Sequence, residues 1–172
     1  MAVVNVPDKG LTMSSPDEIQ AYLSQIEIEY ERVENEPRIS PDASPEDILN
    51  AYSTEIEKLK VRGGYQVADV IDIKPQTPNL ETMLERFRPE HWHDEDEVRF
   101  IVKGRGTFHI APKNADVVAI TMEAGDLIRV PRGTHHWFDL CDERTVRAIR
   151  LFQDTSGWTP HYTETGREKN YK

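Results

Sequence analysis

The chain has 172 residues, with 21 lysines and arginines against 31 aspartates and glutamates, which gives a formal net charge of −10 at pH 7. This length fits one domain around a single core, and the acidic balance argues against a protein that binds the phosphate backbone of nucleic acid. No window approaches the roughly 18 apolar residues that cross a bilayer, the first residues lack a signal-peptide pattern, and the single Cys141 permits no intrachain disulfide, so we expect a cytoplasmic protein without membrane partners.

The first part of the chain, residues 1–62, is rich in charge and predicts helices. A serine, a proline and two acids at 15–18 are typical of a helix start, and the same order recurs at 44–47. Apolar residues follow both starts at helical spacing. The residues between them, 34–45, form a polar connector that contains prolines, and a third, short helix is expected over 78–86.

From about residue 90 the pattern changes to short runs rich in β-forming residues, separated by turns that contain glycine and proline. The runs are 98–102, 106–110, 117–120, 126–130, 137–138 and 147–152. Strands this short with frequent turns predict an antiparallel sandwich or barrel. We therefore expect one domain, with a helical part at 1–62, a β core at 64–160 and a loose polar tail at 163–172.

The first feature with chemical meaning is the pair His91 and His93, which an acidic run follows. On a strand, residues two apart point to the same face, so both imidazoles can reach one ion. Glu97 shares that parity, but a straight strand would place it about 13 Å beyond His93. Glu97 can join the two histidines only if residues 94–96 turn and fold it back.

The second feature is the run 126–130, which ends in a Pro-x-Gly turn at Pro131 and Gly133 and leads to His135 and His136. Each part is common by itself. Together with the first feature, they supply two histidines, a carboxylate and a further histidine. This set suits Fe(II), Ni, Mn, Co or Zn and is too rich in nitrogen for Ca or Mg. Four such ligands leave two octahedral positions open, which is enough for a bidentate substrate.

These two segments resemble the two motifs of the cupin superfamily. They read His91-x-His93-x3-Glu97-x6-Gly104 and Gly125-x5-Pro131-x-Gly133-x2-His136. The register of the second motif selects His136 rather than His135 as the fourth ligand. The chain has Glu85 and Leu140 where the superfamily often has glycine and asparagine, but neither is a ligand position. The resemblance implies a mainly β fold, the cupin double-stranded β-helix (jelly-roll) barrel, with the N-terminal helices packed against it.

Within the cupins, the chain resembles the acireductone dioxygenases, densely from about 64 to 160. The likeness includes positions that are not ligands, among them Glu90, Arg99, Phe138, Arg150 and Trp158. It implies a methionine-salvage enzyme that oxidises acireductone, 1,2-dihydroxy-5-(methylthio)pent-1-en-3-one, with O2 and one Fe(II) or Ni(II) per chain. In this family the Fe(II) form yields formate and 4-methylthio-2-oxobutanoate. The Ni(II) form yields formate, carbon monoxide and 3-(methylthio)propanoate.

The resemblance also implies the metal ligands and one catalytic residue. The ligands are His91, His93, Glu97 and His136. Arg99 matches the residue that favours the substrate dianion, and because it shares strand parity with Glu97 it could aim a fixed positive charge at the same place. The simpler interpretation of Arg99 is an ion pair with Glu97.

Two further groups of residues match family positions. Glu90 and Asp96 match positions linked to metal incorporation and to conformational transmission, and the implied substrate-pocket residues are Phe87, Phe138, Arg150 and Trp158. Three of the pocket residues have a second interpretation. Phe138 could be plain core, Arg150 could pair with a buried carboxylate, and Trp158 could cap the core.

Two other functions stay open from the sequence. One is a non-catalytic metal-binding cupin that serves as a metabolite-binding or sensor protein, and the other is a cupin with different chemistry, such as an isomerase. The complete ligand set with Arg99 argues against the first, and the matches outside the ligands argue against the second. We expect a monomer whose partners are acireductone and O2, because nothing in the chain resembles a coiled-coil seam.

Overall fold

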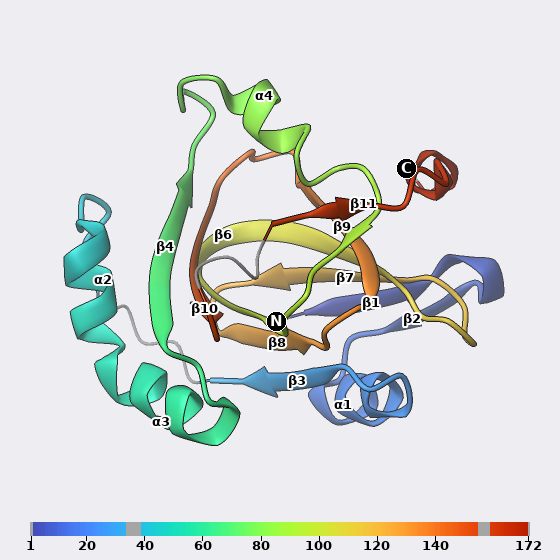
Figure 1. Cartoon of the computed structure of the whole chain (residues 1–172), viewed down its shortest axis with the longest axis horizontal. Coiled ribbons are helices and arrows are strands. Elements are labelled where there is room, and N and C mark those ends of the chain that lie inside the picture. Colours follow the sequence, from blue (N-terminus) through green and yellow to red (C-terminus); the bar gives the residue numbers. More distant parts are fainter. Residues whose placement is uncertain (1, 34–38, 155–158, 172) are drawn as a thin grey trace.

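The computed structural model describes residues 2–33, 39–154 and 159–171, and strands dominate it (Figure 1). The strands are β1 (Val3–Val6), β2 (Leu11–Met13), β3 (Glu29–Arg32), β4 (Val67–Ile73), β5 (His91–Trp92), β6 (Glu97–Ala111), β7 (Val118–Glu123), β8 (Asp126–Val130), β9 (His135–Leu140), β10 (Val146–Phe152) and β11 (His161–Tyr162). The helices are α1 (Pro16–Gln25), α2 (Pro45–Ala51), α3 (Ser53–Gly63) and α4 (Leu80–Leu84), and short 3-10 turns lie at Pro7–Lys9 and Arg167–Asn170.

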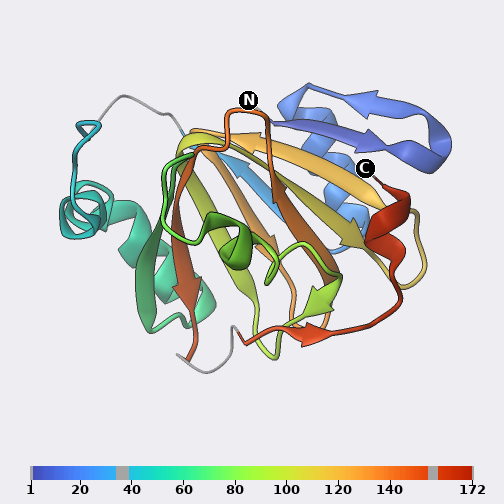
Figure 2. The same cartoon turned by 90° about the horizontal axis from the view of Figure 1, so that it is seen from above.

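The long strand β6 links the two layers of the barrel. Its first half pairs with β8 and β10, and its second half pairs with β7 and β9, always antiparallel. One layer runs β11-β5-β9-β6-β7-β1-β2, and the other runs β4-β10-β6-β8-β3. Figure 2 shows the strands wrapped around a common interior. The prediction of a mainly antiparallel β-barrel is confirmed.

Residues 103–106 do not end a strand, although their two glycines suggested a turn. The backbone at Gly104 has a φ of 76°, and the register against β10 shifts between Arg147 and Ala148. A Cβ at Gly104 would lie 2.1 Å from the carbonyl oxygen of Thr145, so glycine is required there. The expectation of two separate strands is wrong, because β6 continues through this segment and pairs with strands of both layers.

The helices of the N-terminal part begin where the sequence predicts. In α2, the Ser44 hydroxyl accepts a hydrogen bond from the backbone N–H of Asp47 at 3.1 Å, and the Asp47 carboxylate accepts one from the Ser44 N–H at 3.2 Å. This capping box fixes the helix start. The helix ends at Ala51, and α3 begins at Ser53, so the apolar stripe that suggested one helix belongs to two. Figure 1 shows both helices lying outside β4.

The purely helical interpretation of residues 1–62 is wrong, because β1, β2 and β3 also lie there. The strand β1 pairs with β7, and β3 pairs with β8, so both extend the barrel. Val4 and Val6 point into the core while their neighbours are partly exposed. Strands of three or four residues give too short an alternation for the period of two to stand out. The tail at 163–172 also has more structure than expected, since residues 167–170 form a 3-10 turn.

The main apolar core lies between the two layers of the barrel. Side chains from both layers fill it, among them Val4, Ile101, Phe108, Ile120 and Ile128. A second apolar cluster joins α2 and α3 to the barrel through Tyr52, Ile56, Phe100, Ile149 and Leu151. No helix in the part of the chain that the structure describes is long and apolar enough to span a membrane.

Asp126 ties β3 to the barrel, and its loss is expected to destabilise the fold. It is fully buried, and its carboxylate accepts hydrogen bonds from the Tyr30 hydroxyl at 2.7 Å, Arg32 at 3.1 Å and the Glu123 backbone N–H at 2.9 Å. Asp126→Ala leaves these donors without an acceptor inside the protein. We therefore predict a loss of about 3 kcal/mol in the free energy of unfolding, measured by urea denaturation.

The matched control is Asp42→Ala, since Asp42 is exposed. This substitution should change the free energy of unfolding by no more than about 0.5 kcal/mol. Equal stability of the Asp126→Ala variant and the parent would show that the buried carboxylate does not hold β3 in place.

Candidate metal centre

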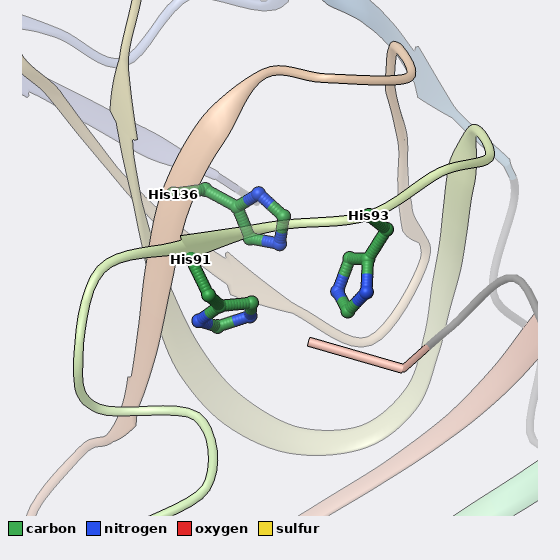
Figure 3. A group of neighbouring side chains, drawn as sticks. All are labelled: His91, His93 and His136. Atoms are coloured by element: carbon green, nitrogen blue, oxygen red, sulfur yellow. The ribbon is translucent and has the colours of Figure 1, made fainter. Parts of the chain in front are cut away.

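Three histidines meet inside the barrel near one of its ends. His91 lies in β5, His93 follows directly after that strand, and His136 lies in β9 opposite His91. One possible ligand atom from each lies within 4.8 Å of the others, and all three side chains are buried. Figure 3 shows the three rings turned toward a common space. Segments more than forty residues apart in the chain thus present three nitrogen ligands to one place.

Glu97 reaches the same space because the chain bends after His93. Residues 94 and 95 form the bend, and β6 then begins at Glu97. Glu97 Oε2 lies 3.3 Å from His93 Nε2 and 2.8 Å from His136 Nε2. The fold-back that the spacing required is therefore present, and the structure brings all four predicted ligands together.

A backbone carbonyl orients each imidazole. The Nδ1-to-oxygen distances are 2.7 Å between His91 and Pro89, 2.8 Å between His136 and Thr134, and 3.2 Å between His93 and Thr159. Because a carbonyl oxygen only accepts, each Nδ1 carries the hydrogen. With its hydrogen on Nδ1, a ring can direct the lone pair of Nε2 into the site, as a metal-binding histidine does.

Glu97 and His136 face each other without forming a hydrogen bond. Glu97 Oε2 and His136 Nε2 are both buried, and within the described residues neither has a hydrogen bond of acceptable geometry, although they lie 2.8 Å apart. With the hydrogen of His136 on Nδ1, Glu97 Oε2 and His136 Nε2 each present a lone pair, and a cation between them would satisfy both. Three imidazoles and one carboxylate fit a divalent ion such as Fe(II), Ni(II), Mn(II), Co(II) or Zn(II).

The charge states of these side chains favour metal binding as well. Burial, with a smaller effect from the neighbouring His136, lowers the pKa of His91 to about 3. Burial alone would raise the pKa of Glu97, but the charge of Arg99 and the nearby histidines outweigh it and hold that pKa well below its usual range. At neutral pH the site therefore contains a neutral His91 and an ionised Glu97, which are the forms that bind metals.

Arg99 is bound to Glu97, as its simpler interpretation expects. Its Nε donates a hydrogen bond to Glu97 Oε1 at 2.5 Å, which leaves Oε2 directed at the histidines. Arg99 also lines the cavity beside the site, and in the described residues its two terminal nitrogens have no hydrogen-bond partner. The ion pair thus fixes the side chain while two donors stay available to a ligand.

The cavity beside the four ligands has one polar wall and is otherwise apolar. Its polar wall consists of His91, Glu97, Arg99 and His136, and its apolar residues are Ile71, Ile73, Phe87, Ile101, Phe108, Phe138, Val146 and Ala148. Of these apolar residues, the sequence reasoning singled out only Phe87 and Phe138. The others lie on β4, β6 and β10, and only the pairing of those strands brings them to one cavity. This shape suits a small molecule with a polar head and an apolar tail.

Phe138 depends on a glycine across the sheet. A Cβ at Gly106 would lie 2.3 Å from the Phe138 ring, so no other residue leaves room for the ring in this position. Phe138 also contacts Phe108, with 4.8 Å between the ring centroids. Gly106 therefore helps to shape the apolar wall.

Arg150 does not line this cavity. Its guanidinium donates two hydrogen bonds to Asp69, at 2.8 and 2.5 Å, and lies 5.0 Å from the centre of the Phe152 ring. The carboxylate that a buried arginine requires is thus Asp69. Arg150 still stands opposite Arg99 in the register of β10 and β6. Trp158, another predicted pocket residue, lies outside the described residues.

Glu90 and Asp96 hold neighbouring segments on either side of the ligands. Glu90 is 1% exposed, and its Oε1 accepts hydrogen bonds from the hydroxyls of Thr163 at 2.6 Å and Thr165 at 2.9 Å. Asp96 accepts a hydrogen bond from Arg129 at 2.9 Å. Glu90, directly before His91, is thus linked to the C-terminal residues, and Asp96, directly before Glu97, is linked to β8.

Comparison with known proteins decides the family. A family profile described as the ARD/ARD' family matches residues 7–160. The chain belongs to the ARD/ARD' family. Similar proteins named acireductone dioxygenase include one from Picosynechococcus, 42% identical over 94% of this chain and 92% of its own length. Another, from Geobacillus thermodenitrificans, is 38% identical over 99% of both chains.

A solved structure supports the same family and the same fold. It is an acireductone dioxygenase from Bacillus anthracis with a cadmium ion in its active centre, and it is 36% identical to this chain. The match has a TM-score of 0.86 and covers 94% of this chain and 98% of that one. The prediction of a cupin barrel is confirmed, and membership of the ARD/ARD' family favours a metal-binding dioxygenase over a non-catalytic cupin.

The low pKa of His91 makes the metal-free protein sensitive to acid. The folded value is about 3, against 6.5 for an unperturbed histidine, so the unfolded chain takes up a proton first as the pH falls. The contribution of His91 to the free energy of unfolding is therefore complete above pH 6.5 and declines as the pH falls toward 3. We predict that between pH 6.5 and 5 it contributes a loss of up to about 1.4 kcal/mol per pH unit.

The measurement is urea denaturation in the presence of a chelator over this pH range, with His91→Gln for comparison. In the variant, the free energy of unfolding should fall less steeply with decreasing pH, because glutamine does not titrate. The same slope in the variant and the parent would mean that His91 is not held neutral by the fold.

Proposed function

We propose that this chain catalyses the reaction of acireductone with O2, with one Fe(II) or Ni(II) held by His91, His93, Glu97 and His136. The observation that carries the proposal is the buried pair Glu97 Oε2 and His136 Nε2, 2.8 Å apart with no hydrogen bond. The names of the relatives supply the substrate, and the Bacillus anthracis relative holds a cadmium ion in its active centre.

The substrate's own chemistry fits this site. Acireductone is an ene-diol conjugated to a ketone, and loss of two protons makes it an electron-rich dianion. A divalent ion held by His91, His93, Glu97 and His136 would supply Lewis acidity to the oxygens of such a dianion. Because the dianion itself is rich in electrons, it can reduce O2 without a change in the valence of the metal, which explains why Ni(II) would serve as well as Fe(II).

The protein's part is to hold the dianion and to keep water away from it. Arg99 is fixed by its bond to Glu97, so its free terminal nitrogens offer a positive charge at a constant place in the cavity. That charge acts strongly because the surroundings are buried. The apolar residues, including Phe87 and Phe138, would surround the methylthio tail of the substrate.

We also propose that the enzyme is a cytoplasmic monomer. The four proposed ligands and the residues that line the cavity all come from one chain. A second copy is therefore not needed to complete the site.

The metal is expected to decide the products. The ligand set suits both ions, and nickel binds more tightly by the general order of affinities, so availability would decide which ion is bound in the cell. Metal-free protein loaded with Fe(II) should convert acireductone to formate and 4-methylthio-2-oxobutanoate. The same protein loaded with Ni(II) should yield formate, carbon monoxide and 3-(methylthio)propanoate. Oxygen uptake no faster than the spontaneous rate with either ion would eliminate this function.

Two substitutions separate metal binding from turnover. His93→Ala should lose most of its bound metal, measured by elemental analysis, because it removes a ligand. Arg99→Gln should keep the metal and lose about 100-fold or more in kcat/KM, because it removes the fixed charge. His109→Ala is the control and should keep both properties, since His109 stacks on Trp137 and is not among the residues that line the cavity. Full metal occupancy in His93→Ala would contradict the ligand assignment.

A further inference from the structure

The C-terminal residues 159–171, called the C-terminal strap below, lie along the segment that carries His91 and His93. In the register of β11 and β5, Tyr162 stands opposite His91 and His161 stands opposite Trp92. The two strands are antiparallel neighbours, and β11 lies at the edge of its layer. The strap is therefore the immediate neighbour of two proposed ligands.

The strap binds Glu90, the residue directly before His91. The Glu90 carbonyl accepts a hydrogen bond from the Thr163 backbone N–H at 3.1 Å. Its carboxylate accepts hydrogen bonds from the Thr163 and Thr165 hydroxyls, and Arg167 Nε lies 3.3 Å from its other oxygen. The strap thus supplies both hydrogen bonds to Glu90 Oε1, while the buried Oε2 has only the ion pair with Arg167 in the described residues.

The strap residue His161 contacts the residues on both sides of His93. The His161 ring stacks on Trp92, with 4.4 Å between the ring centroids and an angle of 25°. Its Nε2 lies 2.8 Å from a carboxylate oxygen of Asp94. The strap therefore contacts the residue before His91, the residue between the two histidines and the residue after His93.

His93 depends on the strap more than the other two histidines do. Pro89 and Thr134, two residues before His91 and His136, supply the carbonyls that orient those rings. The carbonyl that orients His93 belongs to Thr159, 66 residues later in the chain. In addition, β5 ends at Trp92, so His93 lies outside the paired strand.

We propose that the C-terminal strap is a positioning element of the metal centre, which orients His93 through the Thr159 carbonyl and is held in place by the bonds of Thr163 and Thr165 to Glu90. The proposal rests on the ligand assignment in the proposed function. Partners that orient a metal-binding histidine change metal affinity by about 10- to 100-fold when they are lost. Loosening the strap should have an effect of that size.

The test uses Co(II) as the probe and the full chain with Thr163→Val and Thr165→Val, which remove two hydroxyls and keep the side-chain shape. The Co(II) dissociation constant, measured by competition with a chelator, should rise about 10- to 100-fold. The visible absorption of bound Co(II) should change as well, because a misoriented imidazole alters the ligand geometry. A second variant, which ends after Tyr162, should show an equal or larger effect.

The matched control is Thr107→Val with Thr121→Val, a pair whose hydroxyls lie 3.0 Å apart on β6 and β7. It should bind Co(II) like the parent. Unchanged affinity and spectrum in both strap variants would overturn the proposal, as would an equal loss in the control pair. Strong Co(II) binding by His93→Ala would instead refute the ligand assignment, so the two failures are distinguishable.

Discussion

The structure depends on the close approach of four buried lone-pair donors. The hydrogens on Nδ1 of His91, His93 and His136 face carbonyl oxygens, and Glu97 is held ionised by Arg99, so each side chain presents a donor with no hydrogen to share. Such an arrangement is unfavourable without a cation and favourable with one.

The fold brings these groups together with few elements. The bend at residues 94–95 places Glu97 beside His93, and the pairing of β5 with β9 places His91 beside His136. The single long strand β6 serves both layers, so that Glu97 and Arg99 in its first half and Phe108 in its second half line one cavity. A polar centre beside an apolar wall is the result, and it matches a substrate with an ene-diol head and a thioether tail.

Much of the centre could be predicted from the sequence, because its information is local. Short segments of the sequence predict three of its features. They are the shared strand face of His91 and His93, the bend that brings Glu97 back, and the turn before His136. The features that escaped prediction are set by distant pairings. Nothing near Thr159 indicates that its carbonyl faces His93, and nothing near Arg150 indicates that Asp69 is its partner. The strands β1 to β3 were missed because three or four residues show no clear period, and Gly104 was interpreted as a turn because a bulge and a turn use the same residue.

The central claim is that one divalent ion is held by three imidazoles and one carboxylate of this chain. Anomalous diffraction at the nickel absorption edge, from crystals of Ni(II)-loaded protein, tests it most directly. The account predicts one strong peak per chain, in contact with His91, His93, His136 and Glu97. A peak elsewhere, or one that lacks contact with any of these four side chains, would contradict it.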